Sequence, residues 1–165
     1  MGRVVDRALN PVAEVKLLDL DDIEMVGEYA GQISELINAL IREQDSLHNA
    51  LYHEHGSVKG WNRQDVLGWV GKGKWFVVAI VGGKLAGIAT LQEEDNDVRL
   101  NNFYVTKGYR GHGLGREMIA CMHKLVTDNT YGGIVLNVYP NNEGAIRLYK
   151  LLGFEPVRVT MRKAM

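Results

Sequence analysis

One glycine-rich segment, Arg110-Gly-His-Gly-Leu-Gly115, has the residue types and spacing of an anion-binding loop. Glycine lets the backbone approach a ligand closely. If a helix starts at this segment, its first N–H groups have no partner within the helix, and they lie at the positive end of the helix dipole. Such donors bind phosphate groups. The segment therefore predicts a cradle for a pyrophosphate.

The flanking residues supply the elements that such a loop needs. Residues 98–105 alternate in part between apolar and polar types and are rich in strand-forming residues. After the loop, apolar residues recur every three or four positions, which predicts one face of a helix. These apolar positions are Leu114, Met118, Ile119, Met122, Leu125 and Val126. The predicted order is thus a strand, the glycine loop and a helix.

Spacing distinguishes this loop from two other phosphate-binding loops. A Walker loop requires Lys and then Ser or Thr after its last glycine, but Arg116 and Glu117 follow Gly115 here. A dinucleotide-binding fingerprint that begins at Gly111 and Gly113 requires its third glycine at the position of Arg116. Both alternatives are therefore disfavoured.

A second motif, residues 142–154, follows a predicted strand over residues 133–138 and the strand-breaking Pro140. Its apolar residues have helical spacing. Asn142 is a suitable N-cap for this helix, and Gly153 is a suitable C-terminal stop.

Together, Arg-Gly-x-Gly-Leu-Gly after Phe-Tyr-Val and Asn-x-x-Ala-x-x-Leu-Tyr-x-x-x-Gly-Phe resemble the two signatures of the GNAT superfamily. These proteins are acyl-CoA-dependent N-acetyltransferases. The resemblance implies acetyl-CoA as co-substrate, no metal, and a primary amine of a small molecule or peptide as acceptor. The CoA-binding residues that it implies are Phe103, Tyr104, Val105, Arg110, Gly111, His112, Gly113, Leu114, Gly115, Asn142, Ala145 and Tyr149.

The remaining elements agree with one GNAT domain over residues 1–165. We expect a strand at 12–20, a helical region at 21–41 that Gly27 and Gly31 could divide, and a hairpin over 75–91. An alternating segment at 157–161 should close the sheet. The fold class is therefore α/β, with a mixed central sheet flanked by helices. The resemblance implies that this sheet splays between strands 98–105 and 133–138.

The implied reaction is direct attack of the amine on the thioester. Tyr149 matches the family's general-acid tyrosine, although its helical spacing also suits a core residue. The amine needs a base or a water chain, because an alkylamine with a pKa of about 10.4 is only about 0.04% neutral at pH 7. Polyamine-type members carry acidic residues where this chain has Asn101 and Asn102. We therefore name Glu94 as the base, acting through water, with Glu93, Asp97 and the histidines of residues 43–60 as alternatives.

Composition limits the possible partners and the setting. Hydrophobic residues make up 46% of the 165 residues, charged residues 24%, and the net charge is −1, which disfavours nucleic acid and anionic membrane as partners. A single Cys121 and the lack of a long apolar N-terminal run predict a reducing, cytoplasmic setting with no membrane span.

Three alternatives remain open from the sequence. The chain could be a catalytically inactive acyl-CoA-binding sensor, because no obvious base lies on 98–105. His48, His53 and His55 beside Glu54 could bind a metal or line the acceptor pocket, but a solvent-exposed loop is favoured. A homodimer is possible, since dimers are common in the family.

Overall fold

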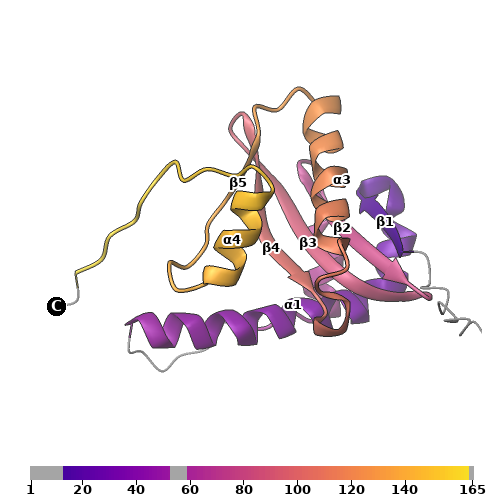
Figure 1. The fold of residues 1–165 in the computed structure, drawn as a ribbon. Coiled ribbons are helices and arrows are strands. Elements are labelled where there is room, and N and C mark those ends of the chain that lie inside the picture. The colour runs from indigo at the N-terminus through magenta and orange to yellow at the C-terminus, as the bar shows by residue number, and fades with distance from the viewer. Residues whose placement is uncertain (1–12, 53–58, 164–165) are drawn as a thin grey trace, which may run out of the picture.

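The computed structural model describes residues 13–52 and 59–163 and shows a twisted sheet with helices on both faces (Figure 1). The elements in chain order are β1 (Ala13–Leu18), η1 (Leu20–Asp22), α1 (Ile23–Tyr52), α2 (Arg63–Trp69), β2 (Lys74–Val81), β3 (Lys84–Glu94), β4 (Asp97–Val105), η2 (Lys107–Tyr109), α3 (Leu114–Asp128), β5 (Ile134–Leu136) and α4 (Glu143–Leu151).

The sheet has five strands in the order β1-β2-β3-β4-β5, so each strand lies beside its neighbour in sequence. The first three pairings are antiparallel, and β4 pairs with β5 in parallel through the α3 crossover. Gly82 and Gly83 turn the β2–β3 hairpin with positive φ angles of 58° and 76°, as a type I′ turn requires. The predicted mixed α/β sheet and its hairpin are confirmed.

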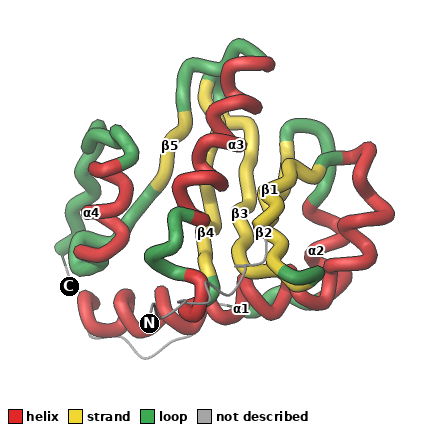
Figure 2. The backbone as a smooth tube through the Cα atoms, turned by 45° about the vertical axis from the view of Figure 1, so that its right-hand side comes forward, coloured by secondary structure: helices red, strands yellow, loops and turns green. Residues whose placement is uncertain are grey.

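The core consists of two apolar layers, one on each face of the sheet. Figure 2 shows α3 lying along the strands and α1 crossing the sheet at one end of them. Buried residues of α1 and α2, such as Ile33, Ile37 and Val66, pack against Phe76 and Ile88 on one face. On the other face, Met118, Met122 and the rest of the buried side of α3 pack against β2, β3 and β4.

Helix α1 is longer than the sequence suggested. Residues 23–52 form one helix of 30 residues, roughly 45 Å long, so the expected division at Gly27 and Gly31 is wrong. The sequence also favoured a loop within residues 43–60, but residues 43–52 belong to this helix, so that expectation is wrong for them. A continuous buried stripe, which includes Val26, Ile33 and Leu40, offsets the glycine cost of about 1 kcal/mol each. The helix therefore stays continuous through both glycines.

A bulge in β4 changes which side chains face each layer. The register moves from Leu91–Leu100 to Thr90–Asn102, so Asn101 is the additional residue. Before it, Val98 and Leu100 pack in the α3 layer; after it, Phe103 and Val105 do so, while Tyr104 packs in the α1 layer. Strand β5 pairs only with Val98–Leu100, so the two strands separate beyond that point. The expected splay is confirmed.

The C-terminal segment differs from expectation. Residues 157–161 form no strand, and the expected closure of the sheet is wrong. Val157, Val159 and Met161 are 88%, 80% and 90% exposed, and the chain after α4 extends away from the sheet (Figure 1). Alternation of apolar residues makes a segment suitable for a strand, but alternation alone does not make the segment pair with an edge of the sheet.

Phe76 tests the layer between the sheet and α1, because its side chain is fully buried. We expect Phe76→Ala to lower the free energy of unfolding by about 3–5 kcal/mol through lost burial and the cavity that remains. Urea unfolding followed by circular dichroism would measure this loss. Val157→Ala, at an exposed position, should change stability by less than about 0.5 kcal/mol. Equal effects of the two substitutions would contradict the assignment of the core.

Candidate active site

The glycine loop turns sharply into α3, as its composition predicted. Gly111 and Gly113 adopt left-handed φ angles of 79° and 86°, which favour glycine strongly. Gly113 is the N-cap of α3, and the helical hydrogen bonds begin with the amides of Arg116 and Glu117, which both donate to the Gly113 carbonyl. The amides before them therefore point out of the helix end, where an anion can bind them.

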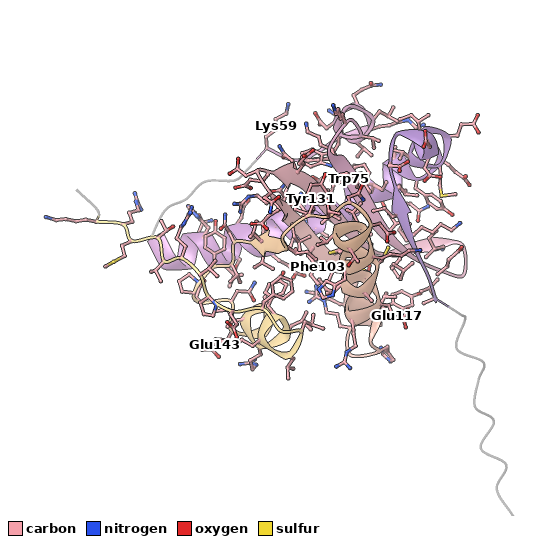
Figure 3. All side chains as sticks on the ribbon, turned by 90° about the horizontal axis from the view of Figure 1, so that it is seen from above. Lys59, Trp75, Phe103, Glu117, Tyr131 and Glu143 are labelled. Atoms are coloured by element: carbon pink, nitrogen blue, oxygen red, sulfur yellow. The ribbon has the colours of Figure 1, made fainter. Side chains whose placement is uncertain are left out.

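Close packing fixes this helix end against β4. A Cβ atom at Gly115 would lie 3.4 Å from Cζ of Phe103, at the limit of ordinary van der Waals contact, so the start of α3 lies close against β4. Leu114 is buried in the same layer. In Figure 3, which views the molecule from above, Phe103 lies between α3 and α4, on the side of the molecule opposite Lys59. The predicted cradle thus lies beside β4 near the splay.

The side chain of Arg110 turns back towards the α1 layer. Its Nε donates to the carbonyl of Val105 at 2.7 Å, and its Nη2 donates to both carboxylate oxygens of Glu43 at 3.2 Å. The guanidinium carbon also lies 5.1 Å from the ring centroid of Tyr104. Sequence reasoning missed Glu43, because it is 67 residues from Arg110 and belongs to no motif. His112 is exposed, and its Nδ1 lies 2.9 Å from the Arg110 carbonyl oxygen.

Tyr149 lies near β4 where the two strands have separated. Its ring centroid is 6.3 Å from that of Phe103 and 5.5 Å from that of Phe154. Burial in these apolar surroundings raises the pKa of Tyr149 to about 12 from its usual value of 10. The hydroxyl therefore carries its proton throughout the neutral range, as a proton donor must.

The cap of α4 follows the sequence prediction. The side chain of Asn142 accepts a hydrogen bond from the amide of Ala145 at 3.2 Å, and Gly153 has a φ of 88° just after the helix. The structure thereby places Asn142, Ala145 and Tyr149 on one short helix beside β4.

Glu94 is not brought into this group. Its carboxylate accepts two hydrogen bonds from Arg99, one of them at 2.6 Å, where the β3–β4 hairpin turns. Its pairing partner Asp97 is six positions before Phe103, which corresponds to roughly 20 Å along the strand. Glu93 is near the same turn, where burial and then Glu93 itself raise the pKa of Tyr131. The structure therefore offers no support for either glutamate as the base.

The end of α1 contacts the connection between β5 and α4. Asn141 donates to the carbonyl of Leu47 at 2.9 Å, and Nδ1 of His48 lies 3.1 Å from the hydroxyl of Tyr139. No motif predicted these contacts, which join residues more than 90 positions apart. His53, Glu54 and His55 lie outside the described residues. Among residues 13–52 and 59–163, no group of three His, Cys, Asp or Glu side chains could hold a metal ion.

Burial raises the pKa of the Cys121 thiol, with a smaller opposing effect from Lys124, so the thiol is poorly suited to act as a nucleophile. No helix among the described residues is both long enough and apolar enough to cross a membrane.

The pKa of Tyr149 gives a test of its burial. We expect Tyr149→Phe to remove a tyrosinate absorbance step that occurs near pH 12. Because the folded-state pKa is raised, its contribution to stability is complete below pH 10 and is lost as the pH rises towards 12. The variant should therefore lose less stability than wild type over that interval. A missing step near pH 10 instead would show that Tyr149 is exposed.

Comparisons with known proteins place the chain among acetyltransferases. A probable spermine N(1)-acetyltransferase of Bacillus subtilis subsp. natto (strain BEST195) is 34% identical over 87 residues, which span 50% of this chain and 57% of that protein. An N-acetylaspartate synthetase of Danio rerio is 32% identical over 90 residues, which span 53% of this chain and 32% of that protein. The chain thus matches little more than half of the first of these relatives.

Solved structures share the fold over nearly the whole chain. A tetramutant of the BH1408 protein from Bacillus halodurans matches with a TM-score of 0.72 and 16% identity, over 92% of this chain and 99% of that one. The aminoglycoside acetyltransferase AAC(6')-Iy, solved with a bisubstrate analogue, matches with a TM-score of 0.64 and 16% identity, over 93% and 99%. At these identities, the likeness shows the fold alone.

The family model described as "Acetyltransferase (GNAT) family" matches residues 34–154, which is more than half of the chain and includes the glycine loop, the splay and Tyr149. The sequence resemblance is thereby confirmed, and the chain belongs to the GNAT acetyltransferase family.

Proposed function

We propose that this protein transfers an acetyl group from acetyl-CoA to a primary amine of a small molecule or peptide, by direct attack in a ternary complex. One observation carries the proposal: in a GNAT chain, the glycine loop at the start of α3 lies beside β4, next to the point where β4 and β5 separate. The loop can bind the pyrophosphate while the splay receives the rest of the donor.

The chain's own groups fit CoA. The left-handed Gly111 and Gly113 shape a backbone cradle for the pyrophosphate, and Arg110 supplies a cation beside it. Beyond Leu100, β4 has no β5 partner, so its backbone edge can bind the pantetheine arm like an added strand. The backbone amide of Tyr104 or Val105, whichever faces this open edge, can polarise the thioester carbonyl. Bound acetyl-CoA supplies an activated acyl group.

The transfer requires two proton movements. The attacking amine loses a proton, and the departing sulfur gains one. Tyr149 supplies the second proton, because its hydroxyl stays protonated beside the splay. We assign no side chain to the first movement, since Asn101 and Asn102 cannot accept a proton and Glu94 lies near the far turn of β4. A water chain can carry that proton.

The acceptor is proposed only as a primary amine. The similar proteins include a probable spermine acetyltransferase and an aminoglycoside acetyltransferase, which supports an amine but favours neither class for this chain. A second candidate function, an inactive acyl-CoA-binding sensor, is favoured by the absence of a carboxylate on β4 from Asn101 to Val105.

Free-thiol release from acetyl-CoA against a panel of polyamines, aminoglycosides, amino acids and N-terminal peptides tests the proposal. We expect Tyr149→Phe to lower kcat by about 100-fold because the leaving group loses its proton donor. Arg110→Ala should raise the KM for acetyl-CoA by about tenfold through the loss of a charge-assisted contact.

Matched controls separate these effects from loss of folding. The control for Tyr149→Phe is Tyr131→Phe, because Tyr131 lies near the distant β3–β4 turn. The control for Arg110→Ala is Arg158→Ala, because Arg158 lies in the exposed C-terminal segment. Both should retain wild-type kinetics. Tight CoA binding without turnover on any acceptor would favour the sensor, whereas absence of CoA binding would contradict both functions.

We also propose that the protein forms a homodimer through its C-terminal segment. Val157, Val159 and Met161 are exposed on alternate positions, and Leu151 is 80% exposed on the preceding helix. Strand β5 is the last strand of the sheet, so its outer edge can accept a strand from a second copy.

Light scattering after gel filtration would test the dimer. We expect twice the chain mass of 18.4 kDa for wild type. Val159→Lys should shift the protein towards the monomer, because it places a charge in the apolar interface, while Arg158→Ala should not. A monomeric wild type at high concentration would contradict this proposal.

A further inference from the structure

One carboxylate of α1 contacts three groups of the strand and loop that form the proposed CoA site. Glu43 accepts from Nη2 of Arg110 at 3.2 Å, and Nζ of Lys107 lies 3.7 Å from Oε1 of Glu43. The hydroxyl of Tyr104 donates to the same oxygen at 3.5 Å. Glu43 therefore neutralises cations that lie next to the glycine cradle.

The position of Arg110 depends on this carboxylate. Its Nε is held by the carbonyl of Val105, and its guanidinium is directed to Glu43 over the ring of Tyr104. Glu43 thus accepts from the same guanidinium donor that a phosphate oxygen would use. An internal carboxylate and an external pyrophosphate cannot both make this contact fully.

The Glu43–Arg110 pair is weak enough for exchange. The side chains of Glu43 and Arg110 are 38% and 43% exposed, and pairs of this kind contribute at most about 1 kcal/mol. A pyrophosphate carries more charge than one carboxylate, and it also binds the backbone amides at the start of α3. The ligand can therefore displace Glu43 from the guanidinium.

We infer that Glu43 is a positioning residue that competes with the CoA pyrophosphate for Arg110, so that CoA binding releases its carboxylate. This inference rests on the proposed use of CoA. The contact orients Arg110 when the loop is empty and lowers the affinity for CoA. After the exchange, the Glu43 carboxylate no longer contacts Arg110, but it stays beside the Tyr104 hydroxyl, near the start of the loop.

Direct CoA binding, measured by isothermal titration calorimetry, tests the competition. We expect Glu43→Gln to lower the dissociation constant for CoA by about three- to fivefold, because the competing charge is lost while side-chain size is kept. Glu35→Gln is the matched control. It makes the same charge change at an exposed position of the same helix and should leave the dissociation constant within about 1.5-fold of wild type.

A double-mutant cycle shows whether the effect passes through Arg110. In an Arg110→Ala background, Glu43→Gln should improve CoA binding by less than about twofold, since Lys107, at the longer distance of 3.7 Å, is then the one remaining cation among the described residues in contact with Glu43. Dephospho-CoA, which keeps the pyrophosphate, should show the full effect of Glu43→Gln. Pantetheine, which lacks it, should show none.

The outcomes separate this inference from the proposed function. If Glu43→Gln binds CoA like wild type or more weakly, or if its gain equals that of Glu35→Gln, the competition is overturned while CoA binding stands. An equal gain for pantetheine would also overturn it. If wild type and all variants fail to bind CoA while thermal unfolding shows them folded, the proposed function itself fails.

Discussion

The site depends on the short parallel pairing between β4 and β5, which covers only Val98–Leu100 against Ile134–Leu136. Beyond it, β4 continues to Val105 with β3 on one side and no strand on the other, so this edge has backbone groups that need water or a ligand. An open edge inside a sheet costs stability unless something pairs with it. The same edge is what allows an extended ligand to bind by main-chain hydrogen bonds.

The bulge at Asn101 lets this open part of β4 serve both layers. After the extra residue, Phe103 faces α3 and Tyr149, while Tyr104 faces α1 and Glu43. Without the bulge, continued alternation from Leu100 would place these two side chains on exchanged faces. One local change of register therefore joins the loop, the α4 tyrosine and the α1 carboxylate at one end of the strand.

Sequence reasoning succeeded where a structure is specified by neighbouring residues. The left-handed Gly111 and Gly113, the Asn142 cap and the hairpin glycines are each fixed by a few adjacent positions, and all were predictable. It failed where the structure depends on contacts between residues that are far apart in the sequence. The continuity of α1 depends on burial against the sheet, and whether the C-terminal segment joins the sheet depends on contacts with residues far away in the sequence. Glu43 meets Arg110 only through the fold, and the distance of Glu94 from the splay follows from the strand register.

The site combines a fixed backbone with an exchangeable side chain. The start of α3 is held by buried packing of Leu114 and Met118 and by the close contact between Gly115 and Phe103, which are costly to disturb. Nε of Arg110 is held by the Val105 carbonyl, whereas its Nη2 is held by a partly exposed ion pair with Glu43, which is cheap to break. The backbone donors can therefore be in place before a ligand arrives, while the guanidinium reorients without any change in the core. This division keeps the reorganisation needed for binding small.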